Sequence, residues 1–232
     1  MTISPLSSAL TSTATTNSQT AAQAAEKADP ITAGLQKSST KLQSMLDTAT
    51  ASLSTLGKFK ASVAASQTAA KALGTLKDTA SSDEVKKALA SFVSTFNTMV
   101  ASTQSAAAAS SGVERISRGM TRAMTADFSR VDALRQMGFT KASDGSLKLD
   151  NSKLEAAFKA SPTAVLGTLS KLGGLVDKVA TKELGSGGGI GQSVNTLSSK
   201  ATVLQMQQNA LLKAAQQYAS FAQARNGSTW SA

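Results

Sequence analysis

The sequence predicts a mainly α, elongated protein in which helices near the two ends of the chain pair as a coiled coil, with a helical body and one small β-hairpin between them. Two observations favour this fold class. Apolar residues recur every seven residues in two long segments near opposite ends of the chain, and one Asp-Gly step lies between two short segments of extended type. Aromatic residues make up only 4% of the 232 residues, which suits slender helices better than a bulky core.

Composition narrows the function classes. The chain has no Cys and no His, so it lacks every thiol nucleophile, the commonest metal ligand and the usual general base at neutral pH. We therefore expect no enzyme, no cofactor, no metal site and no small-molecule substrate. The formal net charge of +10 permits nucleic acid, an anionic membrane or an acidic protein as partner. No apolar run is long enough to span a membrane.

The N-terminal part is predicted to be a flexible tail over residues 1–30, followed by a coiled-coil helix over 31–77. The tail is rich in Ser, Thr, Ala and Gln and carries few charges. The helix is indicated by a seven-residue apolar repeat, with further apolar residues three or four positions later. The repeat consists of Leu35, Leu42, Ala49, Leu56, Val63 and Ala70.

The body is predicted over residues 81–184. Ser81 and Glu84 form a capping-box pattern at the start of its first helix. The Ala/Ser-rich segment 102–111 predicts a break or loosening of that helix, and a further helix is expected to end at Gly138. The hairpin is expected near 139–149, with Asp144 and Gly145 as its turn.

Short helices are expected after the hairpin. Asp150 or Ser152 is predicted to cap the first of them, and Ser161 to cap the next, ahead of Pro162 at its first position. Gly173-Gly174 and the glycine run that begins at Gly185 are predicted to bracket one more short helix.

The C-terminal coiled-coil helix is predicted over 185–225, with a flexible tail over 226–232. Its seven-residue repeat consists of Ile190, Leu197, Leu204, Leu211 and Tyr218. The glycine run before it resembles a phosphate-binding loop only superficially, because Gln192 and Ser193 follow where Lys and Ser/Thr are needed. We interpret the run as a hinge.

One basic cluster is a candidate contact face. Arg115, Arg118 and Arg122 share a helical face, where they could pair with a neighbouring subunit or an acidic partner, or remain solvated. The alternative of a nucleic-acid or anionic-surface binder would use the same face, but the sequence lacks interleaved aromatic residues and a helix-turn-helix pattern. The carboxylates of Asp144, Asp150 and Glu155 fail the spacing of a calcium loop and are explained by turns and caps.

Several segments resemble the flagellar filament-capping family, the second hook-associated protein. Residues 92–99, Phe-Val-Ser-Thr-Phe-Asn-Thr-Met, are similar to that family's FV-xx-YN-x-L helix, and residues 134–139 to its L-xx-I-G-I step. Residues 144–150 with Lys153-Leu154 resemble its DGTLSLD-xx-KL motif, residues 161–165 its P-x-A-V step, and residues 56–63 its LGKLKSAL segment. The likeness covers roughly residues 31 to 221.

The resemblance implies a minimal family member. In the family, β-rich outer domains lie between the N-terminal helix and the FV-xx-YN helix, whereas here eight residues separate Leu76 from Val85. It implies export through the flagellar type III pathway, ring-like self-assembly at the filament tip, and flagellin and hook–filament junction proteins as partners, with an export chaperone as a further candidate. The alternative within this class is a flagellin-like or hook-junction axial subunit. We rank nucleic acid last among the partners.

Overall fold

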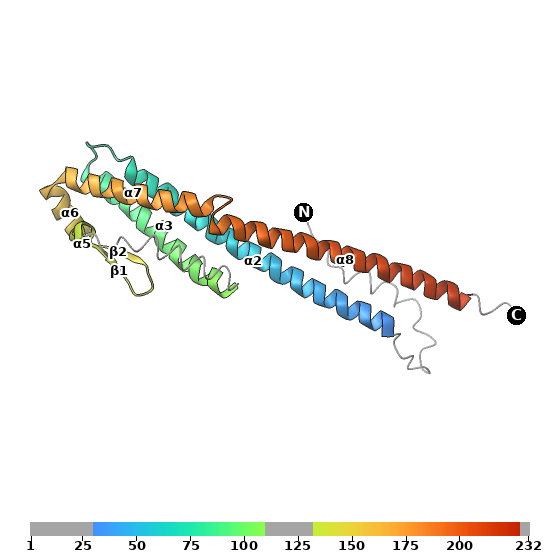
Figure 1. The fold of residues 1–232 in the computed structure, drawn as a ribbon. Helices are drawn as coiled ribbons and strands as arrows, with labels where there is room; N and C mark the ends of the chain where they lie inside the picture. The colour runs from blue at the N-terminus through green and yellow to red at the C-terminus, as the bar shows by residue number, and fades with distance from the viewer. Residues whose placement is uncertain (1–29, 110–131, 228–232) are drawn as a thin grey trace. The chain divides into compact units, whose positions relative to one another are not determined.

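A computed structural model describes residues 30–109 and 132–227, and it confirms a mainly α fold with one small antiparallel hairpin (Figure 1). The face of Arg115, Arg118 and Arg122 lies outside the described residues, and so do the predicted tails except at their inner ends. There the predicted boundaries are wrong by one or two residues, because α2 already begins at Pro30 and α8 continues to Gly227. The elements are α2 (Pro30–Gly74), α3 (Ser82–Ala109), α5 (Asp132–Gln136), β1 (Phe139–Lys141), β2 (Leu147–Leu149), α6 (Asn151–Ala160), α7 (Pro162–Leu184) and α8 (Gly189–Gly227).

The chain divides into two compact units. The first consists of Met1–Lys41 and Leu211–Ala232, so its described parts are the beginning of α2 and the end of α8. The second consists of Leu42–Ala210 and holds the remainder of both long helices together with every other element. Each long helix therefore belongs partly to one unit and partly to the other.

The core lies in the second unit, where α2, α3, α6, α7, the hairpin and the start of α8 contribute to one apolar cluster. The rings of Phe92 and Phe96, one helical turn apart on α3, lie 5.8 Å apart between centroids and are completely buried. Burying these rings and the surrounding aliphatic side chains is the main favourable term for this unit. The largest fully buried side chains also include Leu56, Phe59, Leu73, Leu89, Met99, Leu147, Leu154, Leu169 and Ile190.

The predictions for the two ends of α3 have different outcomes. Its start is the predicted capping box: the Glu84 carboxylate accepts from the Ser81 backbone N–H at 2.7 Å, and the Ser81 hydroxyl accepts from the Glu84 N–H at 3.3 Å. The predicted loosening from residue 102 is wrong as far as Ala109, to which the helix runs. Alanine is the strongest helix former, and Thr103 and Ala106 are buried, so both propensity and packing keep this segment helical.

Helix α7 is continuous through Gly173-Gly174, so the prediction that these glycines end a helix is wrong. Gly173 instead faces α2. A Cβ added to Gly173 would lie 2.4 Å from the Ala70 carbonyl oxygen and 2.9 Å from the Gly74 nitrogen. The missing side chain therefore permits close contact between the two helices, which compensates for the low helix propensity of glycine.

The hairpin and its neighbours follow the predicted turn chemistry. Strands β1 and β2 pair antiparallel with Phe139 opposite Leu149. Gly145 has φ +89°, a conformation that favours glycine. Asp150 caps α6 by accepting from the backbone N–H groups of Ser152 and Lys153. Ser161 occupies the cap position of α7 ahead of Pro162, but its hydroxyl makes no capping hydrogen bond, so that part of the prediction is wrong.

Candidate functional surface

The two predicted apolar repeats lie on the inward faces of α2 and α8. In the second unit, Leu56, Val63, Ile190 and Leu204 are at most 4% exposed. Leu42 and Leu197, at other positions of the two repeats in this unit, are half-buried. A seven-residue apolar spacing keeps one side of each helix directed at a neighbouring helix, and these positions meet that requirement.

The same repeats are less well covered in the first unit. Leu35, Leu211 and Tyr218 are only half-buried there. Ile31 and Phe221 have exposed fractions of 51% and 64%. Two helices packed side by side leave the flanks of their common stripe in water, so this part of the chain presents apolar surface that a further helix could cover.

A polar pair, of which Gln208 is buried and Gln43 half-buried, joins α2 to α8 inside the second unit. The Gln208 side chain, 4% exposed, donates from Nε2 to Gln43 Oε1 at 2.5 Å. Gln43 in turn donates to the Asp47 carboxylate at 2.8 Å, which fixes the orientation of its amide. Such a pair in a largely apolar seam favours one pairing geometry over others, because a misaligned partner leaves the buried Gln208 amide without a hydrogen bond.

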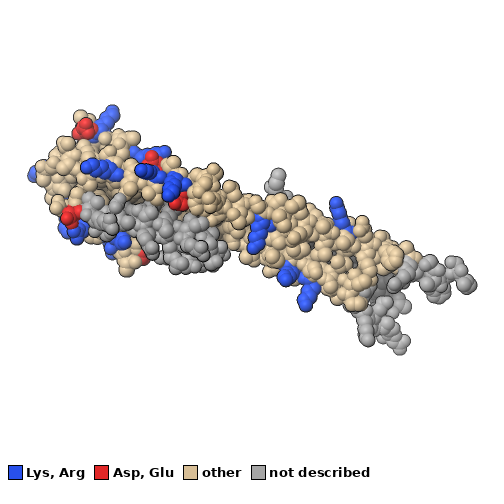
Figure 2. Space-filling model, in the orientation of Figure 1, with Lys and Arg blue, Asp and Glu red and all other residues tan. Residues whose placement is uncertain are grey.

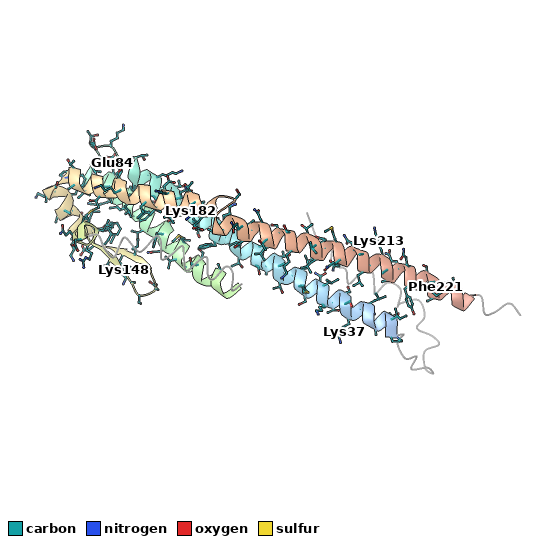
Figure 3. All side chains as sticks on the ribbon, in the orientation of Figure 1. Lys37, Glu84, Lys148, Lys182, Lys213 and Phe221 are labelled. Atoms are coloured by element: carbon teal, nitrogen blue, oxygen red, sulfur yellow. The ribbon has the colours of Figure 1, made fainter. Side chains whose placement is uncertain are left out.

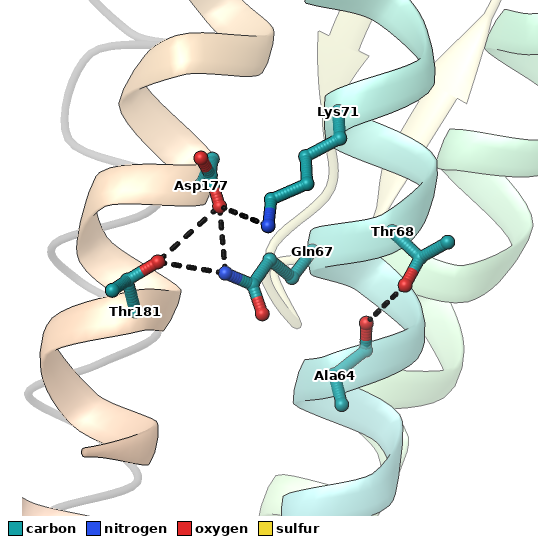
Figure 4. A network of polar contacts seen from close by, with 6 residues as sticks. All are labelled: Ala64, Gln67, Thr68, Lys71, Asp177 and Thr181. Carbon is teal, nitrogen blue, oxygen red and sulfur yellow. Dashed lines mark hydrogen bonds and ion pairs between the residues drawn. The ribbon is translucent and has the colours of Figure 1, made fainter.

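A second polar network joins α2 to α7 (Figure 4). One carboxylate oxygen of Asp177 accepts from Gln67 at 2.6 Å and lies 3.5 Å from the Lys71 ammonium, while Gln67 also donates to the Thr181 hydroxyl. The Gln67 hydrogen bond, followed by the Lys71 charge, lowers the pKa of Asp177 from its ordinary value. This network and the Gly173 contact, one helical turn apart on α7, together hold α7 to α2.

The hairpin is attached to α3 through one side chain. Asn97 donates from Nδ2 to the Leu147 carbonyl at 2.9 Å and accepts at Oδ1 from the Leu147 N–H at 2.8 Å. The amide thus pairs with the backbone of β2 as a neighbouring strand would. Asn97 lies in segment 92–99 and Leu147 in segment 144–150, and the structure brings these two segments into contact.

An ion pair supports the same end of the second unit. Lys86 on α3 lies 2.5 Å from the Glu155 carboxylate on α6, and 3.3 Å from Asp83 one helical turn earlier. The hydrogen bond to Glu155, together with that to Asp83, raises the pKa of Lys86. Both carboxylates are exposed, so the Glu155 contact orients α6 against α3 more than it stabilises the fold, and the Asp83 contact stays within α3.

The glycine run before α8 forms a hydrogen-bonded junction. The Gly188 N–H donates to the Gly185 carbonyl at 2.9 Å, and the Gly189 N–H donates to the Glu183 carboxylate at 3.0 Å. A Cβ added to Gly188 would lie 2.1 Å from the Lys182 carbonyl oxygen. The start of α8 is therefore held against the end of α7, and its first N–H donates to a carboxylate of the same chain.

Sequence reasoning located the two seams and the Asp144-Gly145 turn, but not the side chains that join the elements. Asn97, Gln43–Gln208 and Gln67–Asp177 connect residues far apart in the chain. Asn97 lies in the FV-xx-YN-like segment, but no local pattern indicates its partner or marks the two glutamine contacts. Within residues 30–109 and 132–227, no three acidic side chains come together as a metal site would require. No helix in the described part of the chain is long and apolar enough to cross a membrane.

No protein-family model, no curated protein and no solved structure matches this chain.

Proposed function

We propose that this chain is a structural subunit of the bacterial flagellum, a filament-cap-like protein that assembles with copies of itself and assists flagellin assembly. The observation that carries the proposal is the incompletely covered apolar seam of the first unit, where Leu35, Leu211 and Tyr218 are half-buried and Phe221 is exposed. Apolar surface of this kind is covered when subunits pack side by side.

The segments that resemble the capping family support the same proposal. Phe92 and Phe96 of the FV-xx-YN-like helix are buried in the core, and Asn97 of that helix pairs with Leu147 of the DGTLSLD-like segment. Two of the resembling segments therefore contact each other in the fold. Under this proposal the chain leaves the cell through the flagellar type III pathway and meets flagellin and hook–filament junction proteins, with an export chaperone as a candidate partner.

The proposed function as a cap and the alternative function as an axial subunit predict different assemblies. A heterologous interface that closes gives a ring, whereas one that does not close gives a long filament. Light scattering and electron microscopy of the purified protein, with and without flagellin, distinguish the two. Closed rings that accelerate flagellin polymerisation would support the cap. Long polymers would favour the axial subunit, and a monomer at every concentration, indifferent to flagellin, would contradict both.

A further inference from the structure

The outward face of α7 carries three lysines, Lys171, Lys178 and Lys182, which we call the lysine ridge. Their spacings of seven and four residues place them on one side of the helix, opposite the buried Leu169 and Val176. At about 1.5 Å per residue the ridge is about 16 Å long. In the space-filling view, basic side chains gather where Figure 1 places α7 (Figure 2), and Figure 3 labels Lys182 near the end of that helix.

The acidic residues of α7 do not neutralise the ridge, because both are engaged elsewhere. Asp177 contacts Gln67 and Lys71 of α2, and Glu183 accepts from the first N–H of α8. Among the described residues, no acidic side chain forms an ion pair with any lysine of the ridge. The ridge is thus an exposed strip of one charge sign.

Beside these lysines two positions have no side chain, and the half-buried Leu175 lies between Lys171 and Lys178. Gly167 and Gly174 lie on the same outward face, and a Cβ added to either would meet nothing within 4 Å. The opposite face of α7 shows what a missing side chain permits, because Gly173 lets the backbone of α2 approach to contact. On the outward face, a helix of a binding partner can approach the α7 backbone in the same way, next to the positive charges of the lysines.

We infer that the lysine ridge binds an acidic helix of another protein. A second copy does not supply such a helix through the described residues. Asp47 is the one acidic residue of α2, α8 has none, and the acidic residues of α3, Asp83 and Glu84, lie in its first turn. Three lysines without aromatic neighbours are few for a nucleic-acid backbone. The exposed positions of the ridge are lysines and glycine, and Leu175 among them is half-buried, so the ridge lacks the exposed bulky apolar side chains with which a helix inserts into a membrane surface.

The binding test uses a designed alanine-rich helical peptide as the probe, with glutamates at i, i+4, i+7 and i+11 on one face. The comparison peptide has the same composition with its glutamates distributed around the helix. At low salt, the parent protein should bind the one-faced peptide about tenfold more tightly than the comparison peptide, and added salt should weaken this binding.

Variants separate the ridge from net charge. Lys171→Glu/Lys178→Glu/Lys182→Glu should abolish the preference for the one-faced peptide. The control Lys87→Glu/Lys153→Glu/Lys159→Glu changes net charge equally at exposed sites on α3 and α6 and should retain it. Circular dichroism verifies that both remain helical. Gly174→Leu keeps the charge but fills the open space at Gly174, so it should also weaken binding.

Several results would overturn the inference. These are equal affinity for the two peptides, equal loss in both triple variants, or unchanged binding by Gly174→Leu. Tighter, ridge-dependent binding of duplex DNA or of anionic lipid vesicles than of the one-faced peptide would identify the wrong partner class. None of these results depends on whether the protein assembles with itself, so the inference and the proposed function fail separately.

Discussion

Replacing Asn97 by Ala should detach the hairpin from α3 while leaving the long helices formed. The variant loses two hydrogen bonds, of 2.9 and 2.8 Å, to the backbone of Leu147. Each contributes about 1 kcal/mol net, and a backbone group left unpaired in a buried place costs about 1–3 kcal/mol. Leu147 is only 2% exposed, so water does not readily replace the amide. We therefore expect a loss of about 2–4 kcal/mol in the free energy of opening the hairpin.

Amide hydrogen exchange at Leu147 measures this opening directly, and urea unfolding followed by circular dichroism gives the effect on the whole chain. Thr98→Ala is the matched control, because it removes an exposed hydroxyl that donates within the same helix to the Ser94 carbonyl. Exchange at Leu147 should accelerate in Asn97→Ala and not in Thr98→Ala. Equal exchange in both variants would refute the role assigned to Asn97.

Three further predictions concern packing, turn geometry and pH. Gly173→Ala should lower the free energy of unfolding by about 1–3 kcal/mol, because the added methyl group overpacks against the Ala70 carbonyl oxygen. Gly174→Ala has open space for the methyl group and should raise the free energy of unfolding slightly. Equal effects in thermal unfolding would contradict the close contact of α7 with α2. Gly145→Val should cost about 1–2 kcal/mol, because φ is +89°, and leave helix content unchanged; unaltered hairpin exchange would count against the turn. The lowered pKa of Asp177 contributes to folding stability. This contribution is fully present at pH values above the ordinary pKa of 3.8 and is lost as the pH falls through the lower pKa of the folded state. Asp177→Asn should therefore reduce thermal stability at neutral pH and flatten its decline in acid, and an identical decline in parent and variant would argue against the network.

The seven-residue repeats and the Asp-Gly turn could be predicted from the sequence because their causes are local. Periodicity fixes which side of a helix is apolar, as Leu56 and Ile190 illustrate, and Gly145 adopts its backbone conformation through its own lack of a side chain. The capping box of Ser81 and Glu84 likewise depends on residues three positions apart. Each of these features can be predicted without knowing which residues pack against it in the fold.

The contacts between elements could not be predicted, because their causes lie far away in the chain. Glycine has a low helix propensity, so Gly173 resembles a residue that ends a helix. Its role in packing depends on the backbone of α2, which lies against it in the folded chain. Asn97 meets Leu147, 50 residues later, and Gln67 meets Asp177, 110 residues later. The Ser161 hydroxyl has the right residue type for a cap but not the right geometry. Residue type at a position limits these interactions without determining them.

The most direct test of the proposed self-assembly compares Phe221→Asp with Gln216→Asp by sedimentation velocity over a range of concentrations. Both positions are exposed near the end of α8 and both changes add one negative charge, but only Phe221 removes apolar surface, of a side chain that is 64% exposed in the single chain. If neighbouring subunits cover this seam, the parent and Gln216→Asp form oligomers and Phe221→Asp stays monomeric with unchanged helix content. Oligomers of equal size in all three proteins, or none in the parent, would contradict assembly through the terminal helices.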